Sequence, residues 1–132
     1  MRLLWVWGPA LAVMAAIFVG SSSSDPAYVP RVISDKLLHL CAYALLGATL
    51  LHAFSDARPE RVTLGRALGA VLVSLLYGIS DEFHQTFVPR RTPDVMDLLM
   101  DLVGGAFGAG VVWIVTTQWL MANRQSSGVK PH

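Results

Sequence analysis

Residues 80–105 decide both the fold and the site, and they read SDEFHQTFVPRRTPDVMDLLMDLVGG. Five of the nine acidic residues of the 132-residue chain fall in this stretch, which lies between two long apolar runs. An ionised side chain near the centre of a bilayer costs about 2.5–3.5 kcal/mol, so charged groups inside membrane segments usually serve a function. The stretch therefore predicts two membrane helices that meet at a polar site.

The composition is that of a membrane protein with a single domain. The chain is 54% hydrophobic and only 14% charged, whereas soluble domains carry about 25% charged residues. The net charge of +1 is uninformative about partners; we expect membrane lipids around the chain and no nucleic acid. The single cysteine, Cys41, excludes an internal disulfide and is expected to be a buried small hydrophobe.

Four apolar segments are long enough to cross a bilayer, which takes about twenty residues. They run from about Leu3 to Gly20, Ser34 to Phe54, Gly65 to Thr86 and Pro93 to Leu120. We therefore predict an all-α integral membrane bundle of four transmembrane helices over residues 1–121. A Ser/Pro-rich connector over residues 21–30 and a polar cytoplasmic tail over residues 122–132 are expected to lack regular structure.

The first segment has an alternative interpretation as a cleaved signal peptide, because Arg2 precedes an apolar run that ends in small residues. The length of the run, the presence of Trp5 and Trp7, and the lack of an A-x-A site argue against cleavage. Either interpretation leaves the topology of the other three segments unchanged.

The placement of Lys and Arg predicts the orientation of the bundle, because cytoplasmic loops carry the larger share. Six lie on the side of the two termini, namely Arg2, Arg58, Arg61, Arg66, Arg124 and Lys130. Four lie on the other side, namely Arg31, Lys36, Arg90 and Arg91. Both termini are therefore predicted in the cytoplasm, and the interfacial tryptophans on that side agree: Trp5, Trp7 and Trp119.

Polar residues recur at helical spacing near the outer ends of three segments. In the second segment Asp35, His39 and Tyr43 share one face. At a rise of about 1.5 Å per residue, His39 lies roughly 7 Å below its helix start, Glu82 roughly 6 Å below its helix end and Asp101 roughly 12 Å below Pro93. The three segments therefore bring titratable groups to a similar depth, and the first segment adds none. Thr92-Pro93-Asp94 is expected to start the fourth helix, with Thr92 as its N-cap.

Three motifs in this order resemble the VanZ-like family of bacterial membrane proteins. They are Asp35-Lys36-x-x-His39-x-x-x-Tyr43, then Glu82-x-x-Gln85-x-Phe87-x-Pro89-x-Arg91, then Asp97-x-x-x-Asp101-x-x-Gly104, within residues 34–108. The resemblance implies the bacterial cytoplasmic (inner) membrane and an envelope role, because the family is named for a protein associated with resistance to the glycopeptide teicoplanin. It supplies no established reaction, and it implies Asn where this chain has Asp101.

The first functional hypothesis is an enzyme that acts on a lipid-linked or envelope substrate. His39 and Glu82 would be its acid–base groups, supported by Asp97 and Asp101. Arg91 and Lys36 would bind an anionic headgroup or phosphate. Further substrate contacts are expected from Asp35, Tyr43 and Gln85. A metal held by His39, Glu82, Asp97 and Asp101 is an alternative, but no H-x-x-x-H pair is present, so neither a metal nor a cofactor is assigned.

Non-catalytic hypotheses stay open beside the enzyme. The same polar groups would hold helices together in a module that binds a lipid, an antibiotic or a protein. An ion pathway is a weaker alternative, because no carboxylate follows the cluster into the other half of any span. Asp81, Arg90 and Asp94 also fit simple ion pairs at the membrane surface. Two small-residue patterns, Gly65-x-x-x-Gly69 and Gly104-x-x-x-Gly108, predict close helix packing and allow a homodimer.

Overall fold

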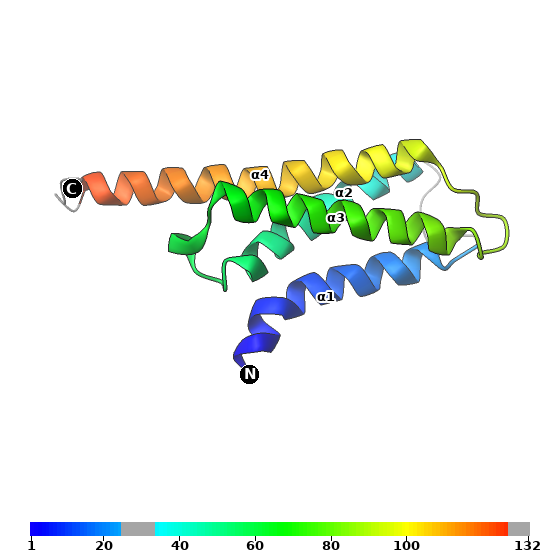
Figure 1. Ribbon diagram of the computed structural model, residues 1–132, viewed down its shortest axis with the longest axis horizontal. Coiled ribbons are helices and arrows are strands. Elements are labelled where there is room, and N and C mark those ends of the chain that lie inside the picture. The colour runs from blue at the N-terminus through cyan, green and yellow to red at the C-terminus, as the bar shows by residue number, and fades with distance from the viewer. Residues whose placement is uncertain (25–33, 127–132) are drawn as a thin grey trace.

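The computed structural model describes residues 1–24 and 34–126, and these residues form four long helices (Figure 1). The helices are α1 (Arg2–Ser21), α2 (Asp35–Phe54), α3 (Leu64–Gln85) and α4 (Val95–Ser126), and a short 3-10 helix, η1 (Pro59–Arg61), precedes α3. All four are long and apolar enough to cross a membrane. The described residues contain no strand, and the predicted all-α membrane bundle of four helices is confirmed.

The helix starts follow from side-chain caps, one of which differs from the prediction. Ser34 caps α2 by accepting a hydrogen bond from the Leu37 N–H. The helix α4 begins at Val95 rather than Pro93, and the cap is Asp94, whose Oδ1 accepts from the Met96 N–H at 2.8 Å. The expected Thr92 cap is therefore wrong, because the carboxylate of Asp94 accepts the hydrogen bond from a free N–H of the first turn.

The C-terminal end of α4 lies beyond Leu120, where the fourth segment was expected to end. The helix continues to Ser126, so part of the predicted tail is helical. The rest of that tail, including Lys130, and most of the predicted connector, including Arg31, lie outside the described residues.

Glycines allow α2 and α4 to pack with their backbones in contact. A Cβ added to Gly108 would lie 1.8 Å from the Ala44 carbonyl oxygen, and one added to Gly47 would lie 2.2 Å from the Gly105 carbonyl oxygen. The predicted packing role of Gly104 and Gly108 is confirmed, because both lie against α2 of the same chain. This glycine face is consequently not free for a second copy, and the homodimer stays a prediction.

The helix α1 packs mainly on α2 and also contacts α3. Tyr77 donates a hydrogen bond to the Met14 carbonyl oxygen at 2.7 Å, and Trp7 meets Phe54 edge to face. Figure 1 shows the first turns of α1 diverging from the other three helices. Pro9 lies in this region, and a proline inside a helix removes a backbone hydrogen bond and favours a bend.

The two ends of the bundle differ in chemistry. The end where α1 and α3 finish and α2 and α4 begin is called the polar end here, and it carries the acidic cluster. At the opposite end Asp56 pairs with Arg2 and, at 3.0 Å, with Arg61. These arginines connect the start of α1 to the turn between α2 and α3.

Many large apolar side chains are exposed on the outer faces of the helices, where a membrane would surround them with lipid. Cys41 is also exposed, so the expectation that it is buried is wrong. The reason is that an apolar run in a membrane helix faces lipid as readily as it faces a protein core, and hydropathy does not separate the two.

Candidate functional site

A histidine and a carboxylate meet between α2 and α4 at the polar end. The Nδ1 of His39 lies 2.8 Å from the Oδ1 of Asp101. The Asp101 side chain is 0% exposed and the His39 side chain is 11% exposed. An ionised Asp101 can only accept a hydrogen bond, so it would hold the proton on Nδ1, and in the neutral imidazole Nε2 would then keep its lone pair. The pair is therefore arranged as an imidazole base oriented by a buried acid.

Neighbouring residues fix the position of this pair. Gly78 on α3 leaves room for Asp101, since a Cβ there would lie 2.7 Å from its Oδ2. The Tyr43 ring lies parallel to the His39 ring, with centroids 6.2 Å apart and an interplanar angle of 5°. The Tyr43 hydroxyl and the Asp101 Oδ2 are both buried without a hydrogen-bond partner among the described residues. A buried polar group without a hydrogen-bond partner destabilises the folded state by about 1–3 kcal/mol. Groups of this kind are often found at functional sites.

Lys36 joins the start of α2 to the start of α4. Its Nζ lies 2.6 Å from the Oδ2 of Asp94 and 2.9 Å from the Oδ1 of Asp97. The hydrogen bond from Lys36 lowers the pKa of the Asp94 carboxyl below its usual range. Lys36 was predicted to bind an anionic substrate, but the structure shows it engaged with two carboxylates of its own chain.

Glu82 and Gln85 secure the loop between α3 and α4. The Oε2 of Glu82 accepts a hydrogen bond from the Asp94 N–H at 2.8 Å. The Nε2 of Gln85 donates to Asp81 at 3.3 Å and to Glu82 at 3.5 Å. Asp81 is buried in this group rather than paired at the surface, which corrects the sequence-based expectation. Its spacing of four residues from Gln85 and from Tyr77 was the available signal.

Arg91 ties the same loop to the start of α2 and to the chain just after α1. Its Nη1 lies 3.3 Å from the Oδ2 of Asp35, and its Nε donates to the Ser23 carbonyl oxygen at 3.3 Å. Six carboxyl groups stand at the polar end beside the cations of Lys36 and Arg91 and the imidazole of His39. They belong to Asp35, Asp81, Glu82, Asp94, Asp97 and Asp101.

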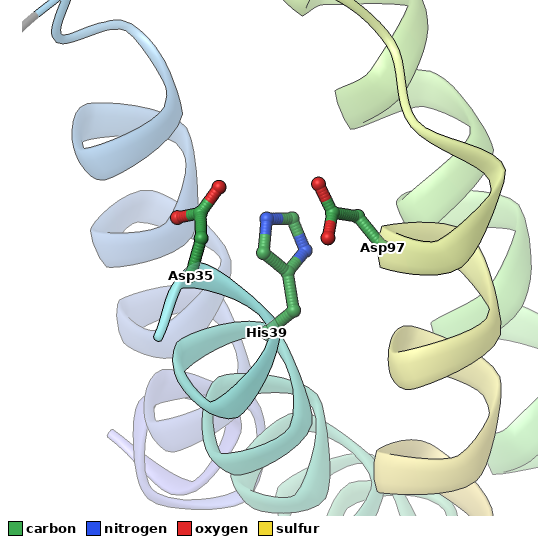
Figure 2. Close-up of side chains that lie close together, drawn as sticks. All are labelled: Asp35, His39 and Asp97. Atoms are coloured by element: carbon green, nitrogen blue, oxygen red, sulfur yellow. The ribbon is translucent and has the colours of Figure 1, made fainter. Parts of the chain in front are cut away.

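Three of these residues could hold a cation. Figure 2 shows the His39 imidazole between the carboxyl groups of Asp35 and Asp97, and each of the three offers a ligand atom within 4.8 Å of the others. This set shares only His39 and Asp97 with the metal alternative considered from the sequence. Arg91 already binds Asp35 and Lys36 already binds Asp97, so a metal ion here would compete with two ion pairs.

A cavity of about 310 Å³ opens beside the pair, between α1, α2 and α3. Polar side chains line it at the polar end, and apolar side chains line it towards the middle of the bundle. The sequence predicted no polar role for the first helix, and nothing in its pattern identified it as a wall of the site. The lining residues are Val13, Ala16, Ile17, Gly20, Ser21, Asp35, Leu38, His39, Ala42, Tyr43, Leu45, Asp81, Gln85 and Arg91.

Comparison with known proteins gives one match. The family model described as VanZ/LLP1 matches residues 7–116, a range that takes in parts of all four helices and every residue of the polar end named above. No curated protein and no solved structure matches the chain.

Proposed function

The chain belongs to the VanZ/LLP1 family, and from that premise we propose that it performs acid–base chemistry on the headgroup of a lipid-linked envelope substrate. The observation that carries the proposal is the contact between His39 and Asp101 beside a cavity with one polar and one apolar end. A histidine whose Nδ1 is fixed by a buried acid leaves Nε2 for proton transfer. This arrangement supports chemistry more directly than it supports helix packing.

The reaction class follows from these groups. The Nε2 of His39 takes a proton from the hydroxyl of water or of an acceptor as its oxygen attacks the headgroup linkage. The same proton then passes to the oxygen that leaves, so His39 ends as it began. Asp101 holds the imidazole in the required tautomer and stabilises it while it is charged. A positioned acid–base group of this kind contributes about 10²- to 10⁴-fold in rate.

Arg91 is the best candidate for binding an anionic headgroup. It lines the cavity, and its one side-chain partner among the described residues, Asp35, lies at 3.3 Å. A guanidinium can hold a phosphate through two parallel hydrogen bonds. Glu82, Asp97 and Lys36 then serve the site by holding α4 and its preceding loop in place, a positioning role rather than a catalytic one.

We further propose a setting for this chemistry in the bacterial cytoplasmic membrane, with both termini in the cytoplasm and the polar end outside. The Lys and Arg distribution supports this orientation. The resemblance to a family named for a teicoplanin-resistance protein supports a contribution to glycopeptide tolerance.

Teicoplanin susceptibility of a susceptible bacterial host tests the proposal. The host expresses the parent chain, His39→Gln or Asp101→Leu at matched membrane levels. His52→Gln is the matched control, because His52 is an exposed histidine of the same helix near its other end. Protection by the parent and by the control, lost in both site variants, is the expected result. Protection that survives His39→Gln would refute acid–base chemistry at this residue.

A non-catalytic lipid-binding module is the second candidate. It is favoured by the number of polar groups that already bind one another, since Lys36 holds Asp94 and Asp97 and Glu82 holds the backbone of Asp94. Such a module would tolerate the neutral isostere His39→Gln while losing function when Arg91→Gln removes the cation. An enzyme would lose function with either change.

A further inference from the structure

We infer that the cavity between α1, α2 and α3 holds one hydrocarbon chain of a membrane lipid, which enters sideways from a single leaflet. The lipid headgroup would lie beside His39 and Arg91. The inference rests on the proposed function for the role of the headgroup, but the site for the chain stands on the shape and lining of the cavity. It also gives α1, which offers no catalytic residue, a function as one wall of a lipid site.

The depth of the cavity matches one leaflet. On α1 its lining runs from Ser21 to Val13, and on α2 it runs from Asp35 to Leu45. At a rise of about 1.5 Å per residue these stretches are roughly 12 and 15 Å long. The hydrocarbon core of a bilayer is about 30 Å thick, so one leaflet contributes about 15 Å. A chain that starts at the polar end would therefore fill the cavity and end near the middle of the membrane.

Like a lipid molecule, the lining of the cavity is polar at one end and apolar along the rest of its depth. Asp35, His39 and Arg91 line the polar end, whereas Val13, Ile17 and Ala42 line the walls beneath it. A sugar or a peptide placed against those walls would lose hydrogen bonds to water without replacement, which is unfavourable for every polar group buried in this way. A hydrocarbon chain makes no hydrogen bonds and therefore loses none on entry. It also restores the dispersion contacts that the walls of an unfilled space lack.

The cavity reaches the outer surface at membrane depth. Leu45 lines it and is 56% exposed, and Ala16 lines it from α1 and is also exposed. A Cβ added to Gly20 would meet nothing within 4 Å, so the wall of α1 is open at that point. Here α1 is fastened to α3 by Tyr77 and by a contact of 3.0 Å between Ser22 and His84. The exposed lining residues Leu45 and Ala16 thus mark where the cavity opens towards the bilayer.

Photolabelling of the full chain in nanodiscs tests the site. The probe is phosphatidylglycerol with a diazirine in the middle of one acyl chain, and labelled residues are identified by mass spectrometry. We expect label on Tyr43, which lines the cavity and is 0% exposed, so lipid on the outer surface cannot reach it. Label confined to outward-facing residues such as Phe107 would overturn the inference.

A pair of glycine variants in one helix sharpens the test. Gly20→Phe places a ring in the cavity, whereas Gly8→Phe places the same ring where a Cβ also meets nothing within 4 Å but outside the cavity lining. We expect Gly20→Phe to lose the label on Tyr43 while keeping the label on Phe107, and Gly8→Phe to keep both. Equal labelling of Tyr43 in the two variants would overturn the inference. If Gly20→Phe does not fold, the labelling pattern of the parent chain still decides.

The binding site for the lipid chain and the proposed acid–base chemistry can each be refuted without refuting the other. His39→Gln should keep the label on Tyr43 while losing protection against teicoplanin, because it leaves the apolar walls intact. Label on Tyr43 together with protection that survives His39→Gln would retain the lipid site and reject the acid–base role. No label on Tyr43 together with protection that His39→Gln abolishes would retain the chemistry and reject the lipid chain.

Discussion

The imidazole of His39 and the buried carboxyl of Asp101 lie 2.8 Å apart, and they join α2 to α4 at the polar end. Both residues come from helices whose backbones touch through glycine, so their separation is fixed by close packing rather than by flexible side chains. Lys36 makes a second connection between the same two helices one turn closer to the surface. This double connection gives the helix pair the rigidity that the proposed acid–base role requires.

The first prediction concerns the acid that orients the histidine. Asp101→Asn keeps an oxygen that can accept the hydrogen bond from Nδ1, and the family resemblance implies Asn at this position. We expect partial activity from Asp101→Asn and a loss of roughly 10²- to 10⁴-fold from Asp101→Leu, which removes the acceptor. Teicoplanin susceptibility at matched membrane levels gives the ranking. Equal protection by the parent and by Asp101→Leu would show that the carboxyl does not support His39.

The second prediction concerns the contact between α2 and α4. Gly108→Ala places a Cβ that would lie 1.8 Å from the Ala44 carbonyl oxygen, so the two helices must move apart. We expect a loss of about 1–3 kcal/mol in the free energy of unfolding, typical of an overpacked contact. Gly110→Ala is the control, because a Cβ there meets nothing within 4 Å. Thermal unfolding in detergent compares the two variants, and similar midpoints would contradict the observed packing.

The third prediction separates a structural role for Lys36 from a substrate-binding role. Lys36→Met leaves Asp97, whose side chain is 8% exposed, without its cation. We expect a loss of stability, and partial recovery in the double variant Lys36→Met/Asp97→Asn, because the second change removes the unpaired charge. Unfolding midpoints of the parent, both single variants and the double variant give the coupling. Additive effects would mean that the two residues do not support each other.

The fourth prediction is a pH dependence at the start of α4. The pKa of Asp94 is lowered in the folded protein, chiefly by its hydrogen bond from Lys36. Its contribution is therefore present above the usual carboxyl range of about pH 4 and is lost as the pH falls through the lowered value. We expect Asp94→Asn, which keeps the helix cap, to unfold at a lower temperature than the parent at neutral pH. The difference should disappear in strong acid, and a constant difference across this range would contradict the ion pair.

The sequence predicts the four spans and places His39 and Asp101 at the same end of the bundle, where they are in contact, because apolar length and helical spacing define which face each residue occupies and how deep it lies. The sequence does not predict which polar side chains bind one another, because the rotation of one helix against another depends on contacts such as that of Gly108 with Ala44. Lys36 therefore proved to bind Asp94 and Asp97, and Asp81 proved to be buried. The exposure of Cys41 has the same origin, because its helix face is set by packing.

The most direct test of the acid–base role is a lipid analysis with purified protein. The parent, His39→Gln and His52→Gln are each reconstituted in nanodiscs made from the total lipid extract of a bacterial host, and lipid headgroups are followed over time by mass spectrometry. We predict that the parent and His52→Gln convert one lipid class at similar rates while His39→Gln leaves it unchanged. Conversion by His39→Gln at the rate of the parent, or no conversion by the parent, would contradict chemistry centred on His39 and Asp101.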